Sequence, residues 1–457
     1  MKRLVTLGAL VFFLAPMSAV DAQFAPGARS VGMGGGGMVF ANGVDAVELN
    51  PANLAFGEGW NLSIAEAGWS GLLTGVTIPN LMTIFADEDF SIPLIGESEG
   101  TAAQVIAELP AEGVTFSTVS EGFLTAYATE QSEAVPQPGS PLPSIGLSFG
   151  NFGLRVRSRV MFDATVSKEL MDLIGNGFVE QNIQSYRVGN TGFNSASFSE
   201  ITASYGTTLG GLLSIGVGGR YVMGHSLVNG MFFEPVLDLI SSPQTLSLTS
   251  VAVEATSGTG YGLDIGLSLD LPMGFRAAVS GTNVIQRMNW DESLTAHTAV
   301  FDDGDFDAED FIDLLDLYQS QPVSPTSVSL PVLTAAEDLF EESYFPATLR
   351  AGLGWQAGGT SIEAVATSVS PRGRHRNAWD ERIGIGIEQR IPLLTLRAGI
   401  AQAEDNIRAL TGGFALRLGW LHIDAGAGLF EGTPDSGNVY EGAYGTVSLQ
   451  LKGGGAR

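Results

Sequence analysis

The sequence predicts an all-β fold: a single antiparallel transmembrane β-barrel with an N-terminal hatch segment and partly helical long loops. Three observations predict it. Apolar residues alternate with small or charged ones over many short segments, the chain starts like an exported protein, and no later apolar run reaches the 18 or so residues of a transmembrane helix. The absence of cysteine excludes disulfide scaffolds and thiol chemistry, and a net charge of -27 argues against binding nucleic acid.

The first element is an export signal at residues 1–22. Two basic residues precede an apolar run from Leu4 to Met17, and small residues follow it up to Ala22. This arrangement is typical of a secretory signal peptide. A retained membrane anchor fits less well, because the run is shorter than the roughly 20 residues that a bilayer-spanning helix needs. The expected mature chain begins at Gln23 and is exported.

The barrel is predicted over residues 60–452, followed by a tail at 453–457. In the segment 261–271, odd positions are Tyr, Leu or Ile and even positions are Gly, Ser or Asp. The same period of two recurs at residues 213–221, 348–355, 382–388, 394–400, 414–420, 421–429 and 447–451. The second face is small or sparsely charged, which suits a lumen better than the polar surface of a soluble β-sandwich. Counting such segments predicts about 14 to 16 strands.

Connections of two kinds separate these segments. From residue 345 to 452 they are only a few residues long, which predicts an antiparallel meander. Longer inserts occur at residues 87–110, 131–143, 167–194, 231–241 and 289–343. Two of them contain helical patterns, at 168–174 and 308–319. In outer-membrane barrels the long connections lie outside the cell, so we expect these inserts to cluster over one mouth.

The hatch is predicted over residues 23–59. It contains four consecutive glycines, Gly34, Gly35, Gly36 and Gly37, and the pair Asn50-Pro51. The glycines permit close packing or positive φ, and Asn-Pro imposes an extended or turn conformation. Neither a βαβ pattern nor a Gly-Lys-Ser/Thr ending is present, so this is not a nucleotide-binding loop. We expect the segment to fold into the barrel, with the Asn50 amide satisfying backbone groups there.

This stretch resembles the opening of FadL-like outer-membrane barrels, in the branch that includes PorV-type barrels of type IX secretion and uncharacterised relatives. The matching residues are 28–35, Asp45-Ala46 and 50–55, with Asn53 where the relatives have glycine. The resemblance implies a barrel of 14 strands closed by an N-terminal hatch. Such barrels include transporters of hydrophobic molecules and components of secretion systems.

Three arginines, Arg155, Arg157 and Arg159, share one face of a predicted strand at 153–162. Facing lipid at the midplane, each would cost about 2–4 kcal/mol, so we expect them to face the lumen. The candidate partner carboxylates are Asp264, Asp270, Glu363 and Glu388. Two interpretations remain: a structural charge ladder, or a site for the carboxylate of a ligand such as a fatty acid.

Signals for catalysis, cofactors or metals are absent from the sequence. The four histidines, His225, His297, His375 and His422, have no catalytic spacing, so no catalytic residue and no cofactor are predicted. The acidic run 302–310 lacks the glycine and glutamate of an EF-hand loop, so no metal site is predicted. His375 lies in a basic turn, 371–376, which is a solvated hairpin tip or a contact for lipid phosphate or an acidic partner.

The sequence therefore predicts an outer-membrane β-barrel for passive transport or binding of hydrophobic or amphipathic small molecules. Its surroundings would be membrane lipid and lipopolysaccharide. The alternative is a secretion or surface-assembly barrel that binds a protein partner through its external loops. A transporter requires an apolar path through the structure, whereas a partner-binding barrel requires only an exposed loop surface.

Overall fold

The computed structural model describes residues 27–57, 59–86, 101, 104–105, 108–110, 113–122, 144–168, 192–238, 245–302, 321–323, 347–369, 381–403, 407–432 and 439–453. The predicted signal peptide, the predicted helix at 308–319 and the basic turn lie outside these ranges. So do the predicted helix at 168–174, apart from Lys168, and the acidic run, apart from Asp302.

Within the described ranges, sixteen strands form one antiparallel sheet. They are β1 (Trp60–Thr74), β2 (Val114–Gly122), β3 (Ile145–Phe149), β4 (Phe152–Val166), β5 (Gly192–Leu209), β6 (Leu213–Asp238), β7 (Thr245–Asp270), β8 (Phe275–Asp302), β9 (Gln321–Val323), β10 (Thr348–Ala357), β11 (Thr360–Val369), β12 (Glu381–Arg390), β13 (Leu394–Ala403), β14 (Arg408–Leu418), β15 (Leu421–Gly432) and β16 (Tyr440–Gly453).

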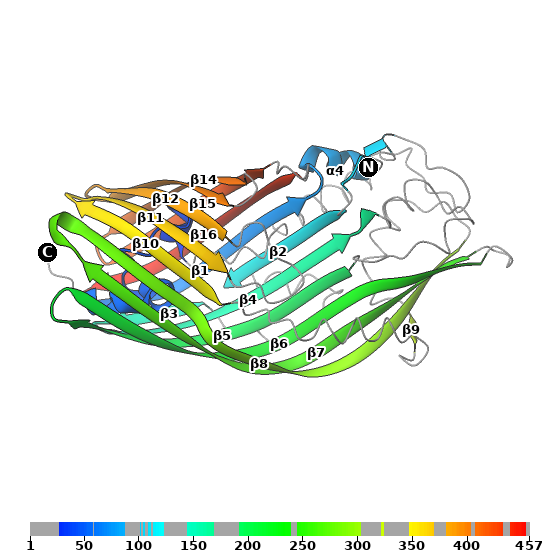
Figure 1. Ribbon diagram of the computed structural model, residues 1–457, viewed down its shortest axis with the longest axis horizontal. Helices are drawn as coiled ribbons and strands as arrows, with labels where there is room; N and C mark the ends of the chain where they lie inside the picture. The colour runs from blue at the N-terminus through cyan, green and yellow to red at the C-terminus, as the bar shows by residue number, and fades with distance from the viewer. Residues whose placement is uncertain are drawn as a thin grey trace.

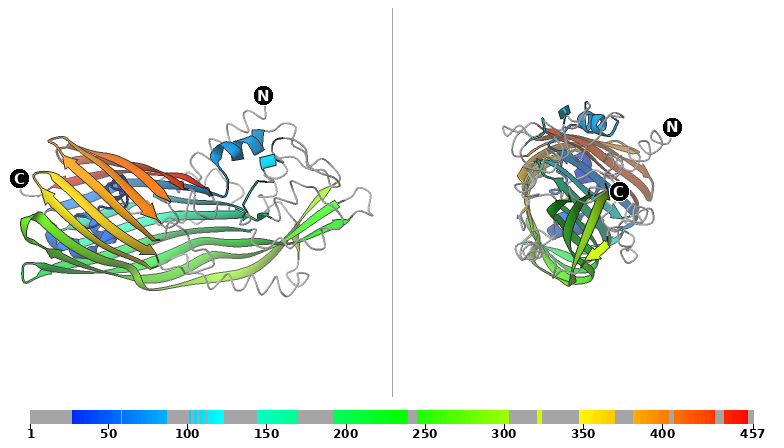
Figure 2. Two further views of the ribbon diagram at one scale, coloured as in Figure 1. Left: turned by 45° about the horizontal axis from the view of Figure 1, so that its top comes forward. Right: turned by 90° about the vertical axis from the view of Figure 1, so that its right-hand side faces the viewer.

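The sheet closes on itself into a barrel (Figures 1 and 2). Successive strands pair in chain order, β16 pairs with β1, and β8 pairs with β10. The strands β2 and β3 share one position between β1 and β4, and β9 pairs only with the far part of β8. The closed ring therefore has 14 strand positions, which confirms the predicted fold class.

The walls alternate as the sequence predicts. In β12, Ile383 and Ile385 are exposed on the outside, while Arg382 and Glu388 are buried on the inside. The same alternation holds in β10, β11 and β13. The outer surface consequently carries a belt of exposed Ile, Leu, Val and aromatic side chains, the surface that lipid covers in a membrane barrel.

The strands differ greatly in length. β10, β11, β12 and β13 have 10 residues each, whereas β6 and β7 have 26 and β8 has 28. All of them start or end near the short turns at one end of the barrel. The long strands therefore extend well past the short ones at the opposite end, on one side of the barrel only (Figure 1).

The described helices are short. They are α2 (Ala28–Gly32), α3 (Val44–Leu49), the 3-10 helix η1 (Pro51–Phe56), α4 (Ile78–Ala86) and the 3-10 turn η2 (Pro272–Gly274). Within the described part of the chain, no helix is long and apolar enough to cross a bilayer. The helices α2, α3 and η1 lie inside the barrel, where Figure 2 shows them in blue within the ring.

The assignment of faces predicts a labelling pattern. Cysteine introduced at Leu353, Ile385 or Leu396 should react with a bilayer-confined thiol reagent, because these side chains are 52%, 47% and 51% exposed on the outer wall. Cysteine at Ser361, which is 1% exposed on the inner face of β11, is the matched control and should stay unlabelled. Labelling of Ser361→Cys with protection of the other three would contradict the assigned faces.

Candidate functional site

The N-terminal segment with α2, α3 and η1 fills the barrel near its short turns. α2 contacts β13, β14, β15 and β16, α3 contacts mainly β4 and β5, and η1 contacts β5, β6 and β7. Apolar residues of this segment form a small core of their own with Ala278 and Val365 of the wall. We call residues 27–57 the hatch, because they lie across the inside of the barrel.

The predicted hatch residues occupy tight positions. Gly34 has φ of 64°, and a Cβ there would lie 2.6 Å from the carbonyl oxygen of Ile400, so only glycine fits. Asn50 caps η1 by accepting a hydrogen bond from the Ala52 amide, and Pro51 is the first residue of that helix. The Asn50 amide also donates to the carbonyl of Leu267 in β7 at 3.2 Å.

A first group of ion pairs holds α2 to the wall. The Arg29 guanidinium donates to Glu363 at 2.6 Å and to Glu388 at 3.0 Å. Glu388 also pairs with Arg397, which pairs in turn with Asp424. Burial alone lowers the pKa of Arg29, but the two carboxylates raise it above its usual value, so the guanidinium stays charged inside the barrel.

A second group of ion pairs contains the predicted arginine ladder. The three arginines face the lumen, and each lies against carboxylates of the protein. Arg155 pairs with Glu48 at 3.2 Å and Glu66 at 2.5 Å, Arg157 with Glu48 at 2.9 Å and Glu121 at 3.3 Å, and Arg159 with Glu121 at 2.7 Å and Glu200 at 3.6 Å. Arg220 continues the row between Glu200 and Asp264. Glu48 belongs to α3, so this row also holds the hatch.

The predicted partners of the ladder are wrong. Asp264 pairs with Arg220, Asp270 with Arg276, and Glu363 and Glu388 with Arg29. The reason is register: the carboxylates opposite the ladder come from the adjacent strands and from the hatch, and a single sequence does not reveal which strands are adjacent. Glu48 in the predicted hatch and Glu66 in β1 were the carboxylates in the sequence that could have been considered as partners.

Apolar clusters line the inner wall beyond the charged row, toward the loop end. Along β6, Val222 and Leu227 follow Arg220 in that direction. One cluster unites Val119, Met161, Ala196, Phe198, Val222, Leu227 and Ala255, with Met288 and Trp290 against it. A second unites Val31, Leu72, Ala401, Ala403, Ile407, Ala409, Phe430 and Tyr444, with Tyr440 against it. The alternation in the sequence predicts a small and sparsely charged inner face, so neither apolar cluster was predicted.

Among the described residues, the strands β2 and β3 leave a gap in their pairing with β1. β2 pairs with β1 from Thr74 down to Ala67, and β3 pairs with it from Ser63 to Trp60. In the part of the chain that the structure describes, the stretch from Ile64 to Glu66 has no strand partner on this side. This break lies at the height of the charged row, since Glu66 binds Arg155 there.

A serine and a histidine also form a hydrogen bond, which was not predicted from the sequence. The Ser199 hydroxyl lies 2.6 Å from Nε2 of His225, and the Ser158 hydroxyl lies 2.7 Å from that of Ser199. Both serines are fully buried on the face opposite the arginine ladder. A nucleophile must reach its substrate, so this chain of hydrogen bonds is not an exposed catalytic pair.

Comparison with known proteins identifies solved barrels of the same fold. No protein-family profile matches the chain, and no curated protein matches it. The toluene transporter TbuX of Ralstonia pickettii matches with a TM-score of 0.50 at 15% identity, over 95% of this chain and 100% of that one. A deletion mutant of the monoaromatic hydrocarbon channel TodX matches with a TM-score of 0.51 at 15% identity, over 93% and 99%. The structural neighbours are therefore hydrocarbon transporter barrels of the FadL family, and this chain shares their fold.

Proposed function

We propose that this protein is an outer-membrane barrel through which hydrophobic or amphipathic small molecules pass passively. The observation that carries the proposal is the apolar inner wall beyond the hatch, where Phe198, Trp290, Phe430 and Tyr444 gather with aliphatic side chains. A water-filled pore needs a polar lining, whereas apolar cargo gains from an apolar one. The two matched barrels are named for toluene and monoaromatic hydrocarbons, which supports the same class of cargo here.

The proposed route begins at the loop end and stops at the hatch. The hatch blocks the other end of the lumen, because both groups of ion pairs hold it to the wall. Cargo that reaches the charged row meets the break between β2 and β3, where β1 has no strand partner from Ile64 to Glu66 among the described residues. We propose that this break is where cargo leaves the lumen toward the lipid.

The arginine ladder fits a structural role, that of holding the hatch to the wall. Arg155, Arg157 and Arg159 are already bound to protein carboxylates, and Arg155 and Arg157 are 1% and 2% exposed. Binding a cargo carboxylate there would displace Glu48 and loosen the hatch. We therefore propose that the ladder holds the hatch, and that apolar contacts rather than a catalytic or charged site receive the cargo.

A second role, binding a protein partner, rests on the uneven strand lengths. β6, β7 and β8 extend past β10–β13 at the loop end and would present a surface outside the membrane (Figure 1). The proposed placement in the PorV-type branch, through the motif at residues 28–55, agrees with this role. The outer wall would contact lipid and lipopolysaccharide in either case, after removal of the signal peptide.

Uptake by cells tests the proposed transport. Cells with this protein in their outer membrane should take up labelled toluene faster than cells without it. Leu227→Asp should slow the initial rate about ten-fold, because burying an unpaired carboxylate raises the barrier by at least the roughly 1.4 kcal/mol that this factor requires. Leu227→Met, which keeps the side chain apolar, is the matched control and should keep the wild-type rate.

Equal uptake with and without the protein would contradict transport of this cargo. Wild-type uptake by Leu227→Asp, in cells that hold equal amounts of folded protein, would contradict passage along the inner apolar wall. Heat-modified migration in gels, which distinguishes folded barrels from unfolded chains, gives the amount of folded protein in each strain.

A further inference from the structure

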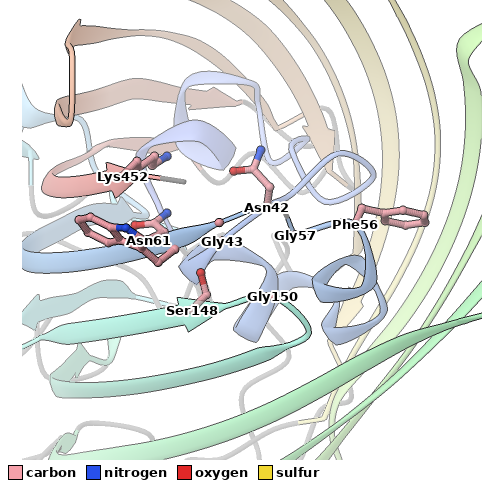
Figure 3. A pocket seen from close by; sticks show the side chains of 11 residues that line it. Asn42, Gly43, Phe56, Gly57, Asn61, Ser148, Gly150 and Lys452 are labelled. Carbon is pink, nitrogen blue, oxygen red and sulfur yellow. The ribbon is translucent and has the colours of Figure 1, made fainter. Parts of the chain in front are cut away.

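A cavity of about 470 Å³ opens at the end of the barrel that carries the short turns. Figure 3 shows Lys452, Asn42, Asn61 and Ser148 gathered around Gly43 of the hatch. The wall side of the cavity comes from the start of β1, the end of β16 and the turn between β3 and β4. In outer-membrane barrels the short turns face the periplasm, so this cavity would open there, on the side of the hatch away from the apolar clusters.

The cavity has a cation without a counter-ion. Within the described parts of the chain, no carboxylate lies within 4.0 Å of the Lys452 ammonium, whereas Arg155, Arg220 and Arg397 of the barrel interior are each paired with carboxylates. An ammonium beside a cavity is a donor for an anionic group, and a carboxylate accepts strong, charge-assisted hydrogen bonds from it. The cavity therefore offers one end that recognises a carboxylate.

The cavity also has an unused acceptor. Asn61 is 5% exposed, its amide nitrogen donates to Gln450 at 3.3 Å, and its carbonyl oxygen has no hydrogen-bond partner among the described residues. A buried acceptor of this kind is seldom left unpaired, and a donor on a bound molecule would satisfy it. Gly43 keeps this amide accessible, because a Cβ there would lie 2.3 Å from the Asn61 side-chain nitrogen.

The rest of the lining is partly apolar. Trp60, 38% exposed, provides ring surface, and Gly453 leaves room for the indole, since a Cβ there would lie 2.7 Å from its nitrogen. Cavities of about 300–1,000 Å³ with a few fixed polar groups are of the size that holds small molecules. This one has room for a single ring with its substituents.

We propose that this cavity binds a small hydroxy-carboxylate with an apolar or aromatic body. The carboxylate would accept hydrogen bonds from the Lys452 ammonium, the hydroxyl would donate to the Asn61 carbonyl oxygen, and the ring would lie against Trp60. The site is separate from the apolar inner wall, so the proposal stands whether or not hydrocarbons pass through the lumen.

Calorimetric titration of the full-length protein in detergent tests this site. The probes are the three hydroxybenzoate isomers, with benzoate lacking the hydroxyl and the hydroxybenzyl alcohols lacking the charge. At least one hydroxybenzoate should bind saturably, and both simpler compounds should bind more weakly. Lys452→Gln should weaken the best isomer about ten-fold or more, since hydrogen bonds to charged groups are the strong ones.

Three further variants make the test specific. Lys452→Arg keeps the charge and should retain most of the affinity. Asn61→Leu should remove the preference for hydroxybenzoate over benzoate while leaving both bound. Arg287→Gln is the matched control and should bind as the wild type does, because the Arg287 side chain donates to exposed Asn289 on β8, away from the cavity lining.

Any of three results would overturn the proposal. The first is that no isomer binds saturably at millimolar concentration. The second is that the wild type binds the hydroxybenzyl alcohols as tightly as the hydroxybenzoates. The third is that the wild type and Lys452→Gln bind the best isomer with equal affinity. The comparison of charged and uncharged probes on the wild type needs no variant, so the proposal remains testable even if Lys452→Gln fails to fold.

Discussion

Removing residues 27–55 from the mature chain is expected to turn a closed barrel into a conducting one. The deleted segment carries α2, α3 and most of η1, which contact strands on all sides of the inside of the barrel. Without it, Arg155, Arg157, Glu363 and Glu388 would face water in an open lumen, where their charges are hydrated and tolerated. Planar-bilayer recordings should show stepwise ion conductance for the deletion and a closed baseline for the intact protein.

A cross-linked hatch is the matched control. The protein contains no cysteine, and a Cβ at Gly146 of β3 would lie 3.2 Å from the Cβ of Val44 in α3. Val44→Cys with Gly146→Cys therefore places two thiols near disulfide distance. The oxidised variant should stay closed. Equal, near-zero conductance of the intact and deleted proteins would mean that something other than the hatch closes the lumen.

Arg29→Met should detach the first part of the hatch while leaving the barrel folded. Arg29 is the only cation bound to Glu363 among the described residues, and that carboxylate is fully buried. Removing one partner of a buried ion pair costs about 3–5 kcal/mol, because the other charge stays buried alone. Amide hydrogen exchange at residues 28–37 should accelerate by at least about a hundred-fold, since local opening sets the exchange rate.

Two comparisons separate this effect from a general loss of stability. Arg29→Met combined with Glu363→Gln removes both charges and should restore much of the protection. Arg287→Met, a change at an exposed arginine, should leave exchange of the hatch unchanged. Unaltered exchange in Arg29→Met would show that the ion pairs do not hold the hatch.

The sequence predicted the wall of the barrel well because alternation has a direct physical cause. A strand between lipid and lumen needs apolar residues on one face and small or polar ones on the other, and β12 shows this most clearly, with three isoleucines outside and glycine and charged residues inside. The expected count of about 14 to 16 strands reflects a real feature, since 16 strands occupy 14 positions. The insert predicted at 131–143 separates β2 from β3.

The pairing of charges was beyond a single sequence. Arg155 and Glu66 meet only because β1 and β4 flank the same break in the wall, and Arg157 meets Glu48 only because α3 lies inside the barrel. Both contacts depend on register and on hatch placement. Alternation fixes which face a charge occupies but says nothing about its height relative to another strand.

The apolar inner clusters were missed for a different reason. Between β5 and β6 the register shifts at Ser197 and Phe198, so the inward positions of β6 change phase near His225. Val222 and Leu227 both face inward, although they are five positions apart in the chain and strict alternation would place them on opposite faces. A bulge of this kind leaves a sequence that no longer alternates, and its inner face cannot be assigned without the structure.

The position of a bound apolar molecule tests the central claim most directly. Crystals of the full-length protein soaked with bromobenzene should show anomalous bromine density inside the barrel, beside Phe198 and Trp290 or beside Phe430 and Tyr444. These side chains belong to the clusters that we assign to the cargo path. Bromine density confined to the outer, lipid-facing surface, with none inside the barrel, would contradict a cargo path along the inner apolar clusters.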